Sequence, residues 1–274
     1  MPQQDSPGVE RTLAEAEIHD QWIADYRTPD NQAFFERVFD ELRPYFAGEE
    51  DRPVLDAGCG TGSQTLRLAS RGKSVIGTDV SLRVLRTARA SIDAHGLGNR
   101  VQLSAGNLLA LPFPDGTFPT VLCWGVLMHM PDVAGGVREL CRVLAPGGHL
   151  IVSEANAASA QARAFRAARR WLKRERADVR YTPSGVENWK TLDSGPLVTR
   201  EADVGWLVEE FARNGLVLME RRAGQLTELY TRTRARAMRT AIHALNRVWF
   251  ERIRLPGPAF GNLLILRKTS MASG

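Results

Sequence analysis

Short apolar runs alternate with amphipathic segments along most of this chain. Strands are predicted for the apolar runs at 54–55, 74–78, 101–104, 120–124, 149–153, 216–220 and 260–268. Helices are predicted where apolar residues recur at helical spacing, at 10–27, 31–46, 63–70, from about 81, and at 132–144, 201–213 and 228–252. Strands that alternate with helices predict βαβ crossovers, and hence an α/β fold whose parallel sheet is covered on both faces.

The alternation breaks between residues 156 and 200. A basic amphipathic helix is predicted at 161–176, with Phe165, Trp171 and Leu172 opposite its charges, followed by a loop punctuated by Pro and Gly. One role for this helix is that of a cap packed on the sheet. The alternative role is a binding surface for anionic lipid, RNA or the phosphate of an activated sugar. The predicted organisation is a helical lid (1–47), a first half of the sheet domain (48–155), a basic helical cap (156–200), the rest of the sheet domain with a cap helix at 228–252 (201–268) and a tail (269–274).

Composition indicates a globular protein. With 274 residues, of which 43 % are apolar and 24 % charged, the chain can bury an ample core. No apolar run is long enough to cross a bilayer, and the first twenty residues carry Asp5, Glu10, Glu15 and Glu17 instead of an apolar signal core. We therefore expect a cytoplasmic protein without stable membrane insertion. Cys59, Cys123 and Cys141 have neither disulfide nor zinc spacing, so we expect buried free thiols and no metal.

Charge is distributed unevenly between the two parts of the chain. Residues 1–155 hold 14 Lys and Arg against 20 Asp and Glu, whereas residues 156–274 hold 22 against 11. The basic part favours an anionic partner, although arginines that solvate helix faces explain the same composition.

The segment VLDAGCGTG, residues 54–62, places a glycine-rich turn between a predicted strand and a predicted helix. Such a turn lets a ligand approach the backbone beyond the carboxyl end of the strand. Because Asp56 would repel a phosphate there, a cationic ligand is favoured over a dinucleotide. The second strand ends in Asp79, where a carboxylate can accept both hydroxyls of a ribose. A ligand with a ribose and a positive charge, but no phosphate, fits both acids.

Four motifs, in order, resemble the class I S-adenosylmethionine-dependent methyltransferases, strongly over residues 30–155 and more loosely to the last strand. They are VLDAGCGTG, VIGTDVS, AGNLLALPFPDGTFPTVLC and RELCRVLAPGGHLIVSE. The resemblance implies a Rossmann-like, doubly wound, seven-stranded and mostly parallel sheet with an antiparallel last strand. It also implies S-adenosylmethionine as cofactor, with Asp79 at the ribose, the glycine turn at the methionine part, and Asn107 with Leu108 at the adenine. The predicted cofactor site comprises Asp56, Gly58, Cys59, Gly60, Gly62, Asp79, Val80, Asn107, Leu108 and Trp124.

Two residues depart from the pattern of that family. Many relatives have an acid at position 107, where Asn107 can accept from the adenine amino group through its amide oxygen. Pro119 stands where an acid is common at the start of the fourth strand, and proline is tolerated at the first residue of a strand. Neither departure removes a cofactor contact.

Methyl transfer from a sulfonium needs an aligned acceptor and, for a hydroxyl, a base. His129, just past the fourth strand, is the first candidate base, with packing or capping of the next helix as its alternative role. His243 is the second candidate, on a predicted helix face that it shares with Asn246, Arg247 and Trp249; a packed or solvated helix explains this face too. Further lid, cap and cleft candidates for contact with the acceptor are Tyr26, Arg27, Glu154, Tyr181, Glu228, Tyr230 and Trp249.

The motifs favour a small acceptor. The fourth strand ends in CWGV, not in the Asn/Asp-Pro-Pro-aromatic sequence that holds the exocyclic amine of a base, and no cysteine has the Pro-Cys or Thr-Cys context that attacks a pyrimidine. We therefore predict a bacterial biosynthetic enzyme that methylates a small molecule, at a hydroxyl of a sugar or secondary metabolite, with an anionic acceptor as one option. An RNA methyltransferase that uses the basic cap and a non-catalytic cofactor-binding protein remain alternatives. A homodimer also remains open.

Overall fold

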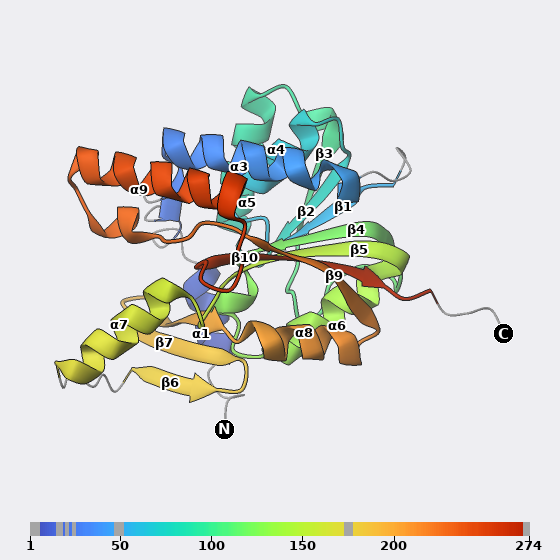
Figure 1. Ribbon diagram of the computed structural model, residues 1–274. Helices are drawn as coiled ribbons and strands as arrows, with labels where there is room; N and C mark the ends of the chain where they lie inside the picture. The colour runs from blue at the N-terminus through green and yellow to red at the C-terminus, as the bar shows by residue number, and fades with distance from the viewer. Residues whose placement is uncertain are drawn as a thin grey trace.

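A seven-stranded sheet crosses the molecule (Figure 1) in the order β3-β2-β1-β4-β5-β10-β9. The computed structural model describes residues 6–14, 19, 22–23, 26–46, 52–172 and 178–270. β10 is antiparallel to both β5 and β9, and the other neighbours pair in parallel. The predicted Rossmann-like sheet with an antiparallel last strand is confirmed. The strands are β1 (Val54–Ala57), β2 (Val75–Asp79), β3 (Val101–Ala105), β4 (Phe118–Trp124), β5 (Leu144–Ala155), β9 (Leu216–Ala223) and β10 (Gly261–Lys268).

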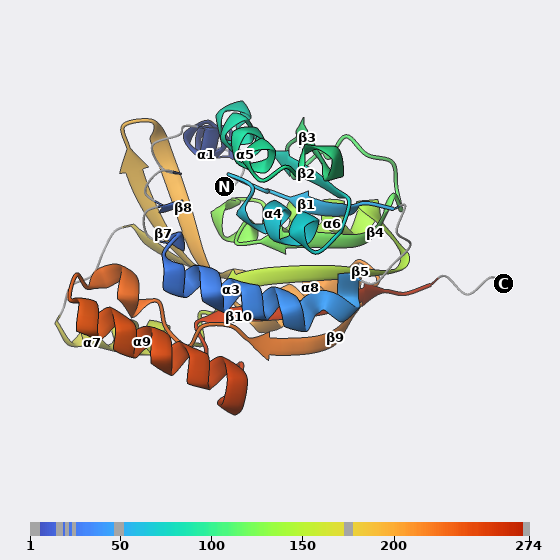
Figure 2. The same ribbon diagram turned by 90° about the horizontal axis from the view of Figure 1, so that it is seen from above.

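Helices cover both faces of this sheet (Figure 2). On one face, α3 (Pro29–Leu42), α4 (Ser63–Ser70) and α5 (Leu82–Ala94) share a hydrophobic cluster, and on the other, α6 (Val133–Val143) and α8 (Val204–Arg213) share a second one. Successive strand residues alternate between the two clusters, since Leu122 joins the first while Val121 and Cys123 join the second. Both faces of the strands are therefore buried, which explains their continuous apolar runs. All three cysteines are buried and free, as predicted.

Side-chain caps fix where several helices begin. Ser81 Oγ accepts from the backbone N–H of Val84 at the start of α5, and Asp132 accepts from Gly135 at the start of α6. α4 begins instead at Gly62, whose φ of 80° is left-handed. Short helical turns complete the sheet domain: η1 (Arg43–Phe46), η2 (Gly98–Arg100) and η3 (Leu127–His129).

The cap contains a second sheet that the sequence analysis missed. The basic helix is present as α7 (Ala160–Trp171), and its predicted residues 173–176 lie outside the described residues. The loop predicted after it is wrong, because β6 (Val179–Thr182), β7 (Gly185–Leu192) and β8 (Gly195–Ala202) form an antiparallel sheet. Gly185 and Gly195 have positive φ where β7 and β8 begin. These glycines therefore belong to the tight turns of β-hairpins and not to a long loop.

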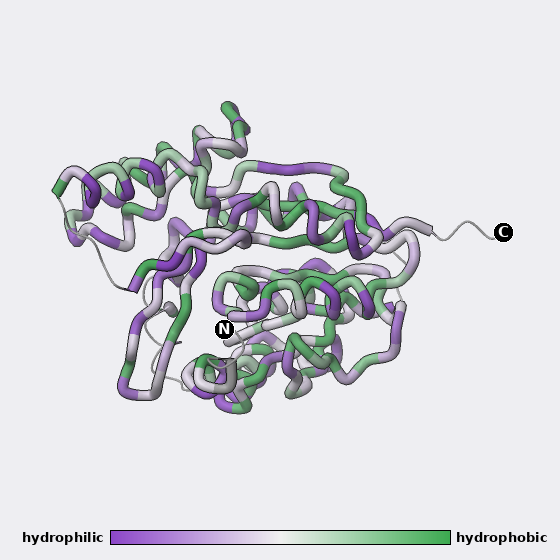
Figure 3. The backbone as a smooth tube through the Cα atoms, turned by 90° about the horizontal axis from the view of Figure 1, so that it is seen from below, coloured by the Kyte–Doolittle hydropathy of each residue, from purple (hydrophilic) through white to green (hydrophobic). Residues whose placement is uncertain are grey.

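The long cap helix predicted at 228–252 is divided into three parts. A short turn, η4 (Leu229–Arg232), precedes α9 (Arg236–Val248), and a π-helical turn, η5 (Trp249–Ile253), ends it. Hydrophilic and hydrophobic residues alternate along these helices (Figure 3). We use the name cap for α7, the β6-β7-β8 sheet, η4 and α9 together.

The first helix, α1 (Ser6–Ala14), lies against β8 of the cap. Ser81 Oγ donates to the carbonyl of Ala14 at 2.8 Å, which joins the end of α1 to the start of α5. The predicted helix at 10–27 falls partly outside the described residues, so its full length stays a prediction. Among the described helices, none is long and apolar enough to cross a membrane.

Candidate functional site

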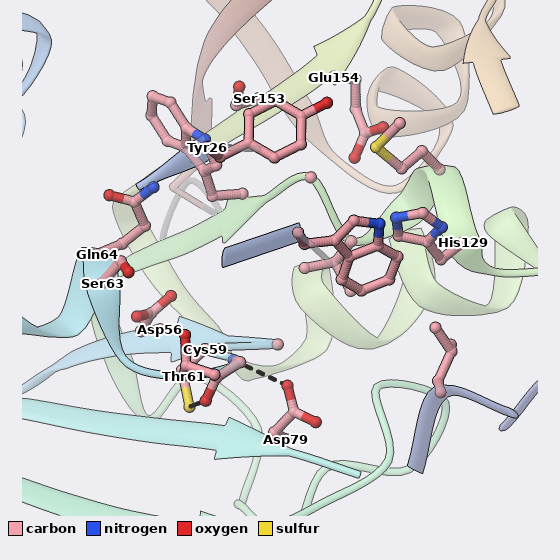
Figure 4. A pocket seen from close by; sticks show the side chains of 18 of the residues that line it. Tyr26, Asp56, Cys59, Thr61, Ser63, Gln64, Asp79, His129, Ser153 and Glu154 are labelled. Carbon is pink, nitrogen blue, oxygen red and sulfur yellow. Dashed lines mark hydrogen bonds between the residues drawn. The ribbon is translucent and has the colours of Figure 1, made fainter. Parts of the chain in front are cut away.

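A cavity of about 440 Å³ lies at the carboxyl ends of β1, β2, β4 and β5. Every predicted cofactor residue except Gly62 lines it. Figure 4 shows Asp56, Cys59, Thr61 and Asp79 on one side of this cavity, and Tyr26, Glu154 and His129 on the other. The topology explains the position, because the carboxyl ends of parallel strands open a crevice where the strand order reverses.

The glycine turn is held against the second strand. The backbone N–H groups of Gly58 and Cys59 both donate to the carbonyl of Thr78 at 2.8 Å. Gly58 has φ of 76°, and a Cβ there would lie 2.5 Å from Val126 Cγ2. Gly60 also has a positive φ, but a Cβ there would meet nothing within 4 Å. Gly58 is therefore required by packing, whereas Gly60 leaves open space at the cavity wall.

The two acids of the predicted cofactor site have different partners. Asp79 Oδ2 accepts the Gly60 N–H at 2.9 Å and its Oδ1 accepts the Ser81 N–H at 3.0 Å. Asp56 Oδ2 accepts the Thr65 hydroxyl at 2.6 Å. Burial raises the pKa of both carboxyls, that of Asp56 to about 7. A cationic ligand beside them would favour their charged forms.

Asn107 bends the chain at the expected adenine end. Its Oδ1 accepts the Leu109 N–H at 2.9 Å. This amide oxygen, which we expected to accept from the adenine amino group, therefore has one of its two lone pairs already occupied. Arg27 binds the far end of the glycine turn that follows β1. It donates to the Thr61 carbonyl at 3.0 Å, to the Thr61 hydroxyl at 2.8 Å and to Ser63 Oγ at 3.1 Å. This places a guanidinium from the segment before α3 at the cavity wall.

His129 lies in the cavity wall in a fixed orientation. A carbonyl oxygen can only accept, so the 2.9 Å contact between Nδ1 and the Val198 carbonyl requires the hydrogen on Nδ1. The ring stacks on Trp22 with centroids 4.7 Å apart. Burial lowers the pKa of His129 to about 4. The imidazole is therefore neutral at pH 7, and Nε2 carries its lone pair.

Two further carboxyls line the same side of the cavity. Glu228 accepts the Tyr26 hydroxyl at 3.0 Å, and burial raises its pKa to about 7. Glu154 Oε1 accepts the Leu127 N–H at 3.0 Å, while its Oε2 is buried without a hydrogen-bond partner among the described residues. Burial raises the pKa of Glu154 to about 8. Of the predicted acceptor residues, the structure thus brings Tyr26, Glu228 and Glu154 together with His129.

Apart from Arg27, which also lines the cavity, the other predicted catalytic and acceptor residues do not line it. His243 stacks on Tyr230 with centroids 4.5 Å apart, and the Tyr230 hydroxyl donates to Gln225 Oε1 at 3.0 Å. Tyr181 is 72 % exposed on β6, and Trp249 Nε1 donates to the Leu255 carbonyl at 3.0 Å. Of the predicted face, His243 packs on Tyr230 of η4 and Asn246 Nδ2 donates to the Thr227 carbonyl, whereas Arg247 is exposed, so these residues do not line the cavity.

Arg200 was missed by the sequence analysis. It is buried on β8 and donates to the carbonyls of Leu127 and Met130 at 3.0 and 2.8 Å, and to Glu187 at 2.6 Å. These bonds hold the η3 turn, which carries His129, against the cap. No sequence signal marks this arginine, since its partners are backbone carbonyls 70 and 73 positions away.

Comparison with known proteins finds a methyltransferase domain in this chain. Residues 54–148 match the family model described as a methyltransferase domain. Methyltransferase GfsG of Streptomyces halstedii is 34 % identical over 120 residues, which cover 43 % of this chain and 43 % of that protein. The chain thus spans less than half the length of the curated relatives it matches.

Solved structures extend the likeness in fold to nearly the whole chain. The [4+2]-cyclase SpnF has a TM-score of 0.62 and 21 % identity, with 97 % of this chain and 98 % of that chain covered. Magnesium protoporphyrin IX methyltransferase from Synechocystis PCC 6803, determined with bound SAH, has a TM-score of 0.62 and 16 % identity, with 94 % and 98 % covered. At these identities the likeness shows the shared fold.

Proposed function

Through residues 54–148 this chain belongs to the class I S-adenosylmethionine-dependent methyltransferases, and we propose that it methylates a hydroxyl of a small molecule such as a sugar or secondary metabolite. The observation that carries this proposal is the division of one cavity into two sides. The glycine turn and Asp79 form one side, and the other is formed by His129, Glu154 and Tyr26, whose hydroxyl donates to Glu228.

The residues on the first side fit the cofactor. Asp79 offers a half-buried carboxylate, and the open space at Gly60 leaves room for a ligand against the backbone. Arg27, beside Thr61 and Ser63, supplies a positive charge suited to a carboxylate at the methionine end. When bound, S-adenosylmethionine supplies an activated methyl group on a sulfonium, so the protein needs only to align the acceptor and accept its proton.

We propose His129 as the base. Its Nδ1 hydrogen is fixed on the Val198 carbonyl, which leaves Nε2 as the proton acceptor. Glu228, whose pKa of about 7 lies near neutral pH, is the alternative base. The Tyr26 hydroxyl bonded to Glu228 then positions that carboxyl.

An uncharged acceptor fits the second side better than the anionic one considered from the sequence. None of the described arginines of α7 lines the cavity, and Arg174 lies outside the described residues. Two carboxyls do line it, those of the buried Glu154 and the half-buried Glu228. An anionic acceptor would be repelled by these carboxyls when they are ionised, so it would bind more weakly and would also raise their pKa further.

Transfer of labelled methyl from S-adenosylmethionine into fractionated cell extract tests this function. Label in a small polar fraction that resists RNase supports a small-molecule acceptor. RNase-sensitive label would support an RNA methyltransferase instead. Confirmed cofactor binding with no label in any fraction would favour a non-catalytic cofactor-binding protein.

A further inference from the structure

The outer ends of α7 and α9 carry exposed apolar and basic side chains that the proposed methyl transfer does not use. Trp171 is 84 % exposed, Leu172 53 % and Met238 55 %. Exposed arginines accompany them at three positions, and we call the six residues the cap end: Arg170, Trp171, Leu172, Arg234, Arg236 and Met238. Figures 1 and 2 both show the C-terminal end of α7 and the N-terminal end of α9 at the same end of the molecule, opposite the C-terminus.

Within the described residues, the arginines of the cap end have no acidic partner. Arg166, elsewhere on α7, pairs with Glu201 at 2.8 Å, and Arg232 lies over the Phe165 ring at 4.6 Å. No carboxylate among the described residues forms an ion pair with Arg170, Arg234 or Arg236. Basic residues also outnumber acidic ones 22 to 11 over residues 156–274. The cap end therefore presents positive charge to an external partner.

We propose that the cap end docks on an anionic lipid surface. Arginines are attracted to acidic headgroups, and a tryptophan ring is favoured at the boundary between headgroups and acyl chains. Leu172 and Met238 gain from burial in that boundary. A nucleic acid would reward the arginines and stack on Trp171, but it offers nothing to these two aliphatic side chains. Because no described helix can span a bilayer, the contact is peripheral.

The proposal does not depend on the acceptor or on methyl transfer. Its test is co-sedimentation of the full chain with vesicles of phosphatidylcholine, with or without phosphatidylglycerol. We expect binding only where phosphatidylglycerol is present, and weaker binding as salt rises. Since one arginine near such a surface contributes about fivefold in affinity, the Arg234→Glu/Arg236→Glu variant should lose at least about tenfold.

Two further variants separate lipid docking from general charge attraction. Trp171→Ser/Leu172→Ser leaves the charge unchanged and should still weaken vesicle binding at least about fivefold. Arg83→Glu/Arg86→Glu makes the same charge change as the first variant in exposed residues of the first turns of α5 and should alter binding by less than about twofold. All six substituted residues are exposed, and circular dichroism melting verifies that each variant folds.

Several results would overturn the proposal. One is no binding to phosphatidylglycerol vesicles at low salt, and another is an equal loss in the α5 control. Binding of an RNA oligonucleotide that exceeds vesicle binding and survives the Trp171/Leu172 change would make the surface a nucleic-acid site. A halving of mass by light scattering in the Trp171/Leu172 variant, without lipid, would make it an interface between copies.

Discussion

His129 Nδ1 donates a hydrogen bond to the carbonyl oxygen of Val198, 69 positions away in the sequence, with 2.9 Å between the nitrogen and the oxygen. The bond joins the turn after β4 to the cap sheet and leaves Nε2 as the proton acceptor. A neutral imidazole so oriented is suited to act as a base, although its pKa of about 4 limits the driving force for proton transfer.

Replacement of the proposed base should lower turnover and not cofactor binding. We expect His129→Gln to reduce kcat by about 10²–10⁴-fold, the contribution typical of general base catalysis, with the cofactor Kd unchanged by calorimetry. Glu228→Gln is the control, with an expected loss below about tenfold in kcat. A near-normal rate for His129→Gln would limit this residue to a structural role.

The pH profile of kcat distinguishes the two candidate bases. A base is active when deprotonated, so turnover falls as pH drops through its pKa. With His129 as base, kcat should stay level from about pH 8 down to about pH 5 and fall near pH 4. A fall near pH 7 that disappears in Glu228→Gln would instead assign the proton transfer to Glu228.

Loss of the Asp79 carboxylate should abolish tight cofactor binding. Two hydrogen bonds to a charged acceptor contribute about 1.5–3 kcal/mol each, so Asp79→Ala should weaken binding at least about 100-fold by calorimetry. Asp93→Ala removes the same charge from an exposed site of α5 and should leave the affinity unchanged. Equal affinity for Asp79→Ala and wild type would contradict the ribose assignment.

Local patterns in the sequence carried the prediction of the sheet and the glycine turn. VLDAGCGTG and the acid at the end of β2 are adjacent to their own strands, so the topology alone brings Asp79 to Gly60. The Pro and Gly residues of the cap were misinterpreted, because glycines at hairpin turns and glycines in loops have the same local signal.

Contacts between distant segments could not be predicted. The Tyr26–Glu228 bond joins residues 202 positions apart, and Arg200 recognises backbone carbonyls that any residue could supply. His243 lies on a helix face, as expected, but only tertiary packing decides that this face meets Tyr230. These contacts between distant segments therefore became visible only in the folded molecule.

The two glycines at the turn should respond differently to alanine. In Gly58→Ala the new Cβ would lie 2.5 Å from Val126 at a positive φ, so we expect a loss of about 2–4 kcal/mol in the free energy of unfolding. Gly60→Ala bears only the positive φ and should lose about 1 kcal/mol. Its Cβ enters the space assigned to the cofactor, so calorimetry should show weakened binding in a folded protein. Unfolding by urea measures the loss of stability in each variant. Equal losses for Gly58→Ala and Gly60→Ala would contradict the prediction.

Stability without cofactor should depend on pH through Glu154. Its pKa of about 8 in the folded chain exceeds the ordinary value of 4.5, so between these values the folded state holds a proton that the unfolded state has released. Stability therefore falls as pH rises across this range. Glu154→Gln removes this loss and should be more stable than wild type by about 5 kcal/mol at about pH 9, with little difference at about pH 4.

Glu139 offers a control of opposite sign for that measurement. Its hydrogen bond to Arg142 holds its pKa below the ordinary value, so it contributes stability above that value and loses it as pH falls. Glu139→Gln should therefore be less stable than wild type at neutral pH. Thermal unfolding of wild type and of both variants is measured at each pH. The lowered pKa of His129 makes stability fall below about pH 6.5 in all three proteins, so this contribution cancels when each variant is compared with wild type. A Glu154→Gln variant that is less stable than wild type at about pH 9 would show that this carboxyl is stabilised as an anion by its backbone partners.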